Sequence, residues 1–222
     1  MVYRTTERGA ELRAASQASI LRAAGKLFAE KGYDATTMQD IVKEARTSIG
    51  NAYFYFANKE AILQSLLESA FVEMFDAAER RAEHIEDGAE KVGTIIAINA
   101  TTFLTARAKM LDILTADSRL GVVQKLGDIA AQRWNRILQA AFPNRAAEEL
   151  ALAAVAIWGV NRSVVERAAR RGTTTDTKGD VTFMVRWTLR ALGIDSRRIN
   201  RIVATAWRVA LRHAREVETQ PW

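Results

Sequence analysis

The chain has 222 residues, of which 49% are hydrophobic and 26% are charged. This composition is too hydrophobic for a disordered protein, and it suffices for one larger or two smaller packed cores. The chain has only 12 glycines and 2 prolines, which are the residues that interrupt helices, while residues that favour helices recur throughout. The composition therefore predicts an all-α fold.

The residues needed for most enzyme sites are scarce. The sequence has no cysteine and only two histidines, His84 and His213, which excludes disulfides and thiolate metal sites. It also has no glycine-rich phosphate loop and no set of ligands at metal-binding spacing. We expect no enzyme, no cofactor and no metal site.

The charge and the hydropathy of the chain limit where the protein can be located and which partners it can bind. The longest apolar run, 150–160, is well short of the roughly 20 residues that span a bilayer, and charges interrupt every candidate signal peptide. We therefore expect a cytoplasmic protein. The net charge of +6 suits a polyanion, either nucleic acid or an anionic membrane surface. In the arginine-rich tail, apolar residues such as Trp207 and Leu211 interleave with the charges, which favours a packing helix over a membrane-binding one.

The first third of the chain predicts three helices followed by a long one. A helix over 11–31 ends at Gly32, and Asn58 caps a helix that continues through Phe75. Between them lie two short helices over 37–45 and 48–56.

Beyond Gly88 the helical spacing of apolar residues continues, with a loop over 172–179. The predicted helices are 89–106, 107–116, 118–142, 145–171, 177–193 and 195–217.

Two short helices joined by a tight turn match the geometry that presents a second helix to the major groove of DNA. Apolar residues at helical spacing are expected to hold the two helices together. These are Ile41, Val42, Ala45, Ala52 and Phe56.

The segment from Thr37 to Leu63, TMQDIVKEARTSIGNAYFYFANKEAIL, resembles the signature of the TetR family of transcriptional regulators, and the similarity spans roughly residues 16–67. The resemblance implies a homodimer that binds a palindromic operator in double-stranded DNA, with repression as the family default and release by a small-molecule inducer. A protein of the same fold that regulates transcription without sensing any ligand is the alternative.

The turn departs from the family pattern at two positions. Arg46 stands where glycine is usual, and Thr47 stands where a small aliphatic residue is usual. We expect Arg46 to adopt either a left-handed backbone or a different turn. Ile49, where basic or polar residues are frequent, could pack on a thymine methyl.

The resemblance also implies roles for single residues. Thr37 is expected to cap its helix and contact a phosphate, and Tyr53 and Lys59 to hold the DNA backbone. The residues expected near base edges are Ser48, Ile49, Gly50, Asn51 and Tyr55, of which Asn51 is best suited to adenine. Core packing of the two tyrosines and a solvated Lys59 are the alternatives.

The basic residues near the N-terminus have two interpretations. Arg4, Arg8 and Arg13 are placed where a minor-groove arm would begin. A frayed terminus is the interpretation that we prefer slightly.

We expect a DNA-binding domain over 1–59 and a ligand-binding and dimerisation domain over 60–222. By resemblance, the helices over 145–171 and 177–193 form the dimer interface. The candidate contacts are Leu152, Val155, Val164, Phe183, Trp187 and Leu192.

A ligand pocket is sought where polar groups interrupt apolar faces near aromatic residues. The candidates are Phe71, Phe75, Asn99, Thr102, Phe103, Trp134, Trp158 and Asn161. For any one of them, an ordinary core position is at least as plausible. Four arginines would favour an anionic ligand, although such a run usually forms a solvated face; they are Arg162, Arg167, Arg170 and Arg171.

Overall fold

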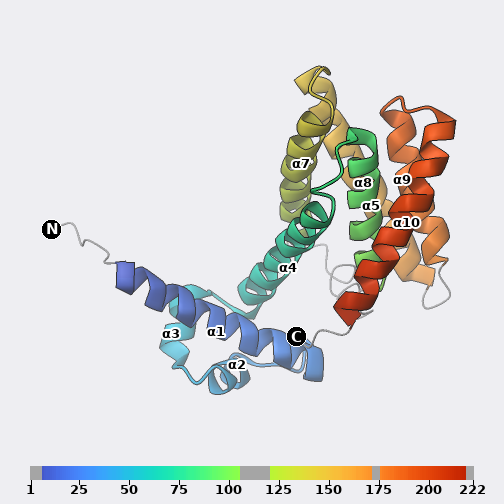
Figure 1. Ribbon diagram of the computed structural model, residues 1–222. Helices are drawn as coiled ribbons and strands as arrows, with labels where there is room; N and C mark the ends of the chain where they lie inside the picture. Colours follow the sequence, from blue (N-terminus) through green and yellow to red (C-terminus); the bar gives the residue numbers. More distant parts are fainter. Residues whose placement is uncertain (1–6, 106–120, 172–175, 219–222) are drawn as a thin grey trace. The chain divides into compact units, whose positions relative to one another are not determined.

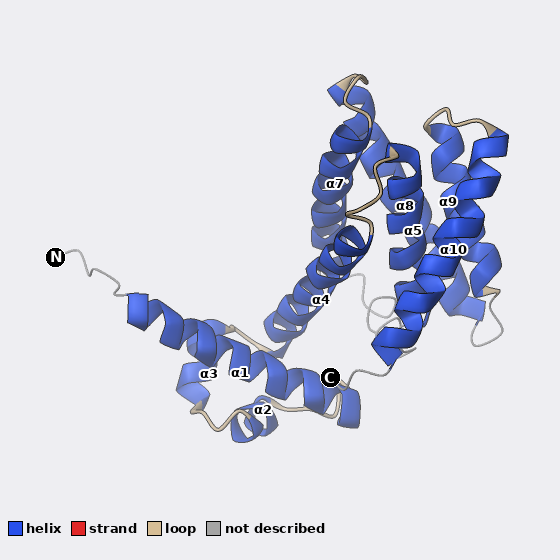
Figure 2. Ribbon diagram, viewed as in Figure 1, coloured by secondary structure: helices blue, strands red, loops and turns tan. Residues whose placement is uncertain are grey.

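The computed structural model describes residues 7–105, 121–171 and 176–218 (Figure 1). Within these ranges every regular element is an α-helix and none is a strand (Figure 2). The predicted all-α fold is thereby confirmed.

The N-terminal helices are α1 (Glu7–Lys31), α2 (Met38–Glu44) and α3 (Ile49–Tyr55). Helix α1 starts four residues earlier than predicted. Arg8 and Arg13 therefore lie within a helix, so that neither an arm nor a frayed terminus describes them, and Arg4 lies outside the described residues. The end of α1 agrees with the prediction, because Gly32 has a φ of 87°, the left-handed conformation that stops a helix.

The described residues divide into two compact units, one up to Ser69 and one from Ala70 onward. Helix α4 (Lys59–Arg81) begins in the first unit and ends in the second. Its predicted cap is present, since Asn58 Oδ1 accepts a hydrogen bond from the Ala61 amide at 2.8 Å. The domain boundary between residues 59 and 60 stays a prediction.

The second unit contains five further helices, which correspond to five of the six segments predicted beyond Gly88. The sixth, 107–116, lies outside the described residues, as do 172–175 of the predicted loop. The helices are α5 (Gly88–Thr105), α7 (Val122–Ala141), α8 (Ala147–Arg171), α9 (Thr177–Ala191) and α10 (Ser196–Glu218).

Helix α5 is the centre of the second unit and packs against α7, α8, α9 and α10. Asp87 fixes its N-terminus, because its carboxylate accepts the Glu90 amide at 2.8 Å and pairs with Arg198 of α10. Burial alone would raise the pKa of Asp87, but the hydrogen bonds from the Glu90 amide and Arg198 outweigh it and lower the pKa.

Part of the acidic surface of α4 meets arginines of α7. Arg133 lies 2.6 Å from Asp76 and 3.0 Å from Glu79, and Arg136 lies 2.9 Å from Glu79. Asp76 and Glu79 therefore help to fix α4 against α7.

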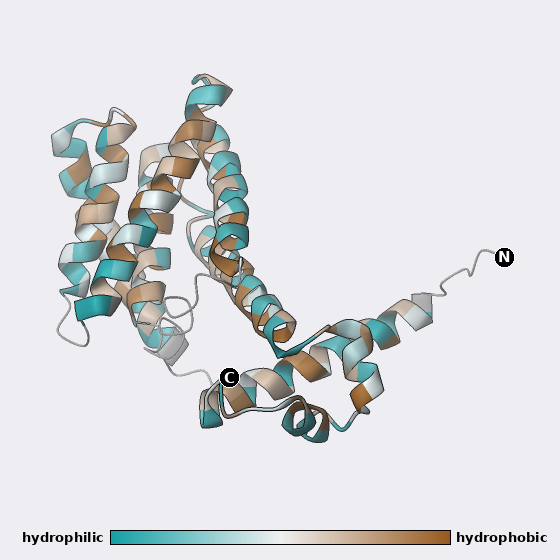
Figure 3. Cartoon of the chain, turned by 180° about the vertical axis from the view of Figure 1, so that it is seen from behind, coloured by the Kyte–Doolittle hydropathy of each residue, from teal (hydrophilic) through white to brown (hydrophobic). Residues whose placement is uncertain are grey.

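Hydrophobic and hydrophilic residues alternate along the helices (Figure 3). Helix α10 buries Ile199, Ile202, Ala206 and Ala210, which recur at the helical spacing of a packing face. Among the described helices, none is long and apolar enough to cross a membrane.

Candidate nucleic-acid interface and interior cavity

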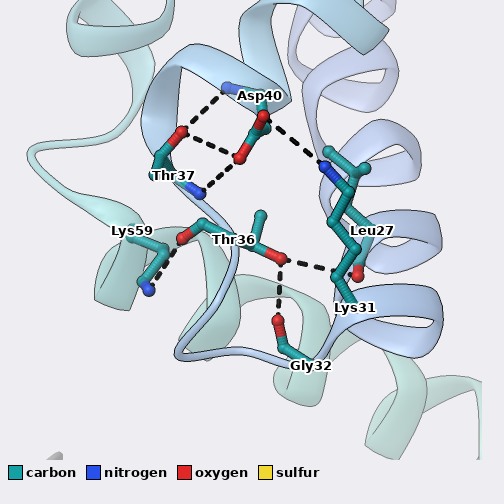
Figure 4. A network of polar contacts seen from close by, with 7 residues as sticks. All are labelled: Leu27, Lys31, Gly32, Thr36, Thr37, Asp40 and Lys59. Atoms are coloured by element: carbon teal, nitrogen blue, oxygen red, sulfur yellow. Dashed lines mark hydrogen bonds and ion pairs between the residues drawn. The ribbon is translucent and has the colours of Figure 1, made fainter.

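The N-terminus of α2 is closed by a reciprocal cap (Figure 4). The Thr37 hydroxyl accepts the Asp40 amide at 3.1 Å, and the Asp40 carboxylate accepts both the Thr37 amide and the Thr37 hydroxyl. These bonds lower the pKa of Asp40. The predicted cap is confirmed. The Thr37 side chain is already bonded within the motif, and its contact with a phosphate stays a prediction.

Lys59, at the start of α4, ties α4 to the loop between α1 and α2. Its Nζ donates to the carbonyls of Tyr33 at 2.7 Å and Thr36 at 2.8 Å, and it lies 4.2 Å from the centre of the Tyr33 ring. Figure 4 shows the bond to Thr36, the residue just before the cap of α2. The ammonium group is therefore engaged inside the first unit rather than solvated.

The turn between α2 and α3 has the bonding pattern of a Schellman motif. The Thr47 amide donates to Val42 O at 3.0 Å and the Arg46 amide to Lys43 O at 3.2 Å. Arg46 has a φ of 52°, which confirms the left-handed alternative. A non-glycine residue in this conformation costs about 1–2 kcal/mol.

Helix α3 is anchored by Ser48 and Asn51. The Ser48 hydroxyl caps the helix by accepting the Asn51 amide at 3.1 Å. Asn51 Nδ2 donates to Ser16 Oγ of α1 at 2.8 Å and to Thr47 Oγ1 at 2.7 Å. Both hydrogens of this group are thus used within the first unit, which leaves only Oδ1 of the side-chain amide for a base edge.

The outer face of α3 is uncharged and strongly exposed. Ile49 is 40% exposed, Tyr53 52% and Phe54 72%. A Cβ at Gly50 would meet nothing within 4 Å, so another molecule can approach closely there. The sequence predicted the exposure of Tyr53, while Tyr55 is half-buried. The sequence analysis did not name Phe54 as an exposed residue. Phe54 follows Gly50 by one helical turn and so lies on the same face of α3, and this spacing could have identified it.

Two lysines of α1 are paired with carboxylates of α2. Lys26 lies 2.7 Å from Glu44, and Lys31 lies 3.6 Å from Asp40. Hydrogen bonding to Glu44 raises the pKa of Lys26, and the same bond lowers the pKa of Glu44. Arg46 and Lys43 lie on the exposed surface of the turn.

A cavity of about 80 Å³ lies within the second unit. Seven of the eight residues predicted for a ligand pocket line it: Phe71, Phe75, Asn99, Phe103, Trp134, Trp158 and Asn161. Thr102 is the exception, because it lies outside the lining and its hydroxyl donates to Ile98 O at 2.9 Å. The sequence reasoning missed Met74, Ala100, Val123, Leu126, Val165, Glu166 and Met184, and considered Arg162 only as part of the arginine run.

Aromatic rings from α4 meet rings from the neighbouring helices in this cavity. The centre of Phe71 lies 5.6 Å from that of Trp158, and Phe75 lies 5.6 Å from Trp134. A Cβ at Gly127 of α7 would come within 2.8 Å of Trp158 Nε1. The absence of a side chain at Gly127 therefore allows Trp158 its position.

Two asparagines that line the cavity carry buried polar atoms without a hydrogen-bond partner. Asn99 is only 5% exposed, and neither Oδ1 nor Nδ2 has a hydrogen bond; Asn161 Oδ1 is likewise buried and unbonded. The charged groups among the described lining residues, Arg162 and Glu166, pair with each other at 2.5 Å. Arg167 pairs with Asp180 of α9. Arg162 and Arg167, two of the four arginines considered for an anionic ligand, therefore each form an ion pair with an acidic residue.

The residues expected at a dimer interface divide into two groups. Leu152, Val155 and Phe183 are exposed by more than half. Val164 and Leu192 are buried in the second unit and are not available to a partner, which corrects the prediction for both. Trp187 is half-buried.

Comparisons with known proteins agree with this architecture. Residues 20–66 match the family described as "Bacterial regulatory proteins, tetR family". An uncharacterised HTH-type transcriptional regulator of Bacillus subtilis, YfiR, is 27% identical over 55% of this chain and 63% of its own length. The chain thus spans less than two thirds of this relative.

Two solved structures share the fold. RolR in complex with resorcinol superposes with a TM-score of 0.68 and 22% identity, covering 87% of this chain and 95% of its own. FadR of Bacillus subtilis in complex with stearoyl-CoA gives a TM-score of 0.57 and 21% identity, covering 77% and 96%. YfiR and FadR are both named as transcriptional regulators. Residues 20–66 therefore match the tetR family of bacterial regulatory proteins, and the described helices share the fold of RolR and FadR.

Proposed function

We propose that the protein is a homodimeric repressor that binds a palindromic operator and is released by a small molecule. The observation that carries the DNA-binding part is the exposed, uncharged face of α3, presented by a turn and caps whose hydrogen bonds are formed within the first unit. A helix held in this way can enter the major groove with little rearrangement.

The backbone contacts are assigned to the turn. Arg46 in the turn and Lys43 in the last turn of α2 are exposed, whereas the ammonium of Lys59 is occupied by carbonyls. We therefore expect Arg46 and Lys43 to contact phosphates and Lys59 to position the α2 cap. Phosphate contacts of this kind set affinity and register without reading sequence.

Base reading is assigned to the outer face of α3. Ile49, Tyr53 and Phe54 offer apolar surface, which suits the C5-methyl of thymine, the one apolar group that bases present in the major groove. Asn51 contributes at most its carbonyl oxygen and otherwise fastens α3 to α1.

Dimer formation is assigned to exposed apolar side chains of α8 and α9. Leu152 and Val155 on α8 and Phe183 on α9 are large hydrophobic residues in contact with water. In a twofold dimer the same patch serves both protomers, and the two motifs then read the two halves of an operator.

The ligand part rests on the cavity. A small apolar cavity with a few polar groups is the usual form of a ligand site, and two proteins of this fold hold resorcinol and stearoyl-CoA. Because the target is bacterial operator DNA, we expect the protein to act in the cytoplasm.

Selection of binding sites from a pool of random double-stranded DNA tests the proposal. We expect an inverted repeat, bound by two protomers about 10³-fold or more tightly than scrambled DNA at the same salt concentration. Sedimentation of the complex gives the stoichiometry, and Leu152→Glu should leave a monomer with weakened operator binding. Equal affinity for all sequences would refute the operator, and specific binding by one protomer would refute the dimer.

A further inference from the structure

The side chain of Asn99 is a buried amide that lines a cavity and has no partner for either of its polar atoms. Almost all buried polar groups in proteins are hydrogen-bonded, so such a group calls for an explanation. A carboxamide offers one acceptor and one donor group side by side. A single hydroxyl, which both accepts and donates, complements it.

The walls of the cavity include five aromatic residues. Phe71, Phe75, Phe103, Trp134 and Trp158 all line it. Two of the ring pairs meet at steep angles, 84° for Phe71 with Trp158 and 75° for Phe75 with Trp134. Aromatic rings favour edge-to-face contacts with one another, so a flat ring finds partners on several sides of this cavity.

The volume limits the ligand to a small compound. One water needs roughly 10–15 Å³ of such space, and the cavity provides about 80 Å³. The cavity therefore has room for about six water-sized groups. This corresponds to one six-membered ring with a short substituent and excludes a long acyl chain that lies wholly inside.

Charge argues for a neutral ligand. Arg162 Nε donates to Glu166 Oε1 at 2.5 Å, and both residues line the cavity. A carboxylate ligand would have to compete with Glu166 for this arginine, and a cation would have to compete with Arg162 for the glutamate. A neutral ligand disturbs neither.

We infer that the cavity binds a neutral compound with a single aromatic ring and a hydroxyl or similar group that hydrogen-bonds Asn99. The binding step stands on the cavity alone, and only its role as an inducer rests on the proposed function. Asn161 Oδ1, the second unbonded acceptor, provides for one more donor on the ligand.

Titration calorimetry of the full chain with four probes tests this inference. Phenol has the ring and the hydroxyl, toluene lacks the hydroxyl, benzoate adds a charge and 1-decanol replaces the ring by a chain. We expect phenol to bind at least tenfold more tightly than toluene, and benzoate and 1-decanol to bind more weakly than phenol. Equal binding of phenol and toluene, or tighter binding of benzoate or 1-decanol, would overturn the inference.

Variants assign the preference to Asn99. Asn99→Leu keeps a similar volume, and we expect it to raise the melting temperature, to reduce the preference for phenol over toluene to less than threefold and to leave toluene bound. Thr102→Val on the same helix is the matched control, because its hydroxyl is bonded to Ile98 O; it should retain the full preference. A full preference in Asn99→Leu would overturn the assignment. If Asn99→Leu does not fold, Asn161→Leu takes its place, and a phenol affinity equal to that of the unmodified chain would then contradict a polar site in this cavity.

The outcomes separate this inference from the proposed function. If phenol binds as described but operator binding is unchanged by it, the ligand class holds and the inducer role fails. If another probe releases the operator while phenol does not bind, the regulatory function holds and the ligand class is wrong.

Discussion

The two units differ in how they treat their buried polar groups. In the first unit the caps of α2 and α3, Asn51 and Lys59 all find partners among neighbouring groups. Within the described ranges, the buried side-chain atoms without a hydrogen bond all belong to the second unit. The polar side chains of the first unit thus bond within that unit, whereas the second unit retains unused hydrogen-bonding capacity in its interior. Replacing a polar side chain should therefore destabilise the first unit and can stabilise the second.

Lys59→Met should have the largest effect, because it leaves the carbonyls of Tyr33 and Thr36 without their donor. Hydrogen bonds to charged groups contribute about 1.5–3 kcal/mol each, so we expect the first unit to lose on the order of 3 kcal/mol. Urea denaturation monitored by hydrogen exchange of α1 and α2 measures it. Lys43→Met, an exposed lysine of the same motif, is the control and should change stability by less than about 0.5 kcal/mol.

The same variant tests the role that the family resemblance implied for Lys59. If Lys59 only positions the α2 cap, the dependence of operator affinity on salt concentration stays unchanged in folded Lys59→Met. A salt slope reduced by about one per lost contact, or about two per dimer, would show that it binds phosphate after all.

Gly127→Ala should disturb the cavity without replacing a residue that lines it. Its new Cβ would come within 2.8 Å of Trp158 Nε1, and overpacking of this kind costs about 1–3 kcal/mol. We expect a lower melting temperature and a shift of the Trp158 indole N–H resonance, which is assigned by comparison with Trp158→Phe. Unchanged stability and spectrum would mean that α7 and α8 do not meet as described.

Arg46→Gly should separate stability from DNA binding in the first unit. Glycine relieves the left-handed strain, so we expect a gain of about 1 kcal/mol, while the loss of the charge should weaken operator and random DNA alike and lower the salt slope. Arg46→Ala loses the charge but keeps the strain, and so should weaken DNA binding without the gain in stability. Unchanged DNA affinity in both variants would remove Arg46 from the interface.

How far the sequence predicted these features depended on the range of the interactions involved. The caps at Thr37 and Asn58 follow from neighbours within three residues, and the left-handed Arg46 was one of two alternatives for a turn without glycine. The engagement of Lys59 with Tyr33 O and of Asn51 with Ser16 depends on chain segments more than 20 residues away, which no local pattern specifies.

The cavity shows the same distinction. Both asparagines were identified because they interrupt apolar helical faces, and the aromatic residues because they lie near such polar groups. Thr102 does not line the cavity, because the rotation of α5 against its neighbours decides which side faces inward. The burial of Val164 and Leu192 could not be predicted either, because the sequence pattern of an apolar residue is the same in the core of one protomer and at an interface between two.

His213 should give the smallest effect, visible only as a function of pH. Burial, and to a lesser extent the charge of Arg81, lower its pKa from the usual value of 6.5, while Glu216 opposes them. The unfolded chain then binds a proton more readily than the folded one, so stability is complete above about pH 6.5 and falls as the pH drops toward the lowered pKa. Thermal melts of the native chain and of His213→Leu between pH 5 and 8 should differ in slope below pH 6.5; parallel curves would contradict a buried neutral His213.

Operator affinity measured by fluorescence anisotropy with and without saturating phenol tests most directly that the first unit reads DNA and the cavity of the second controls it. Native protein, Asn99→Leu and Thr102→Val are compared at one salt concentration. We expect phenol to weaken operator binding about 5- to 150-fold, the usual range of coupling between two sites, in the native protein and Thr102→Val but not in Asn99→Leu. Unchanged operator affinity in native protein that calorimetry shows to be saturated with phenol would contradict the account.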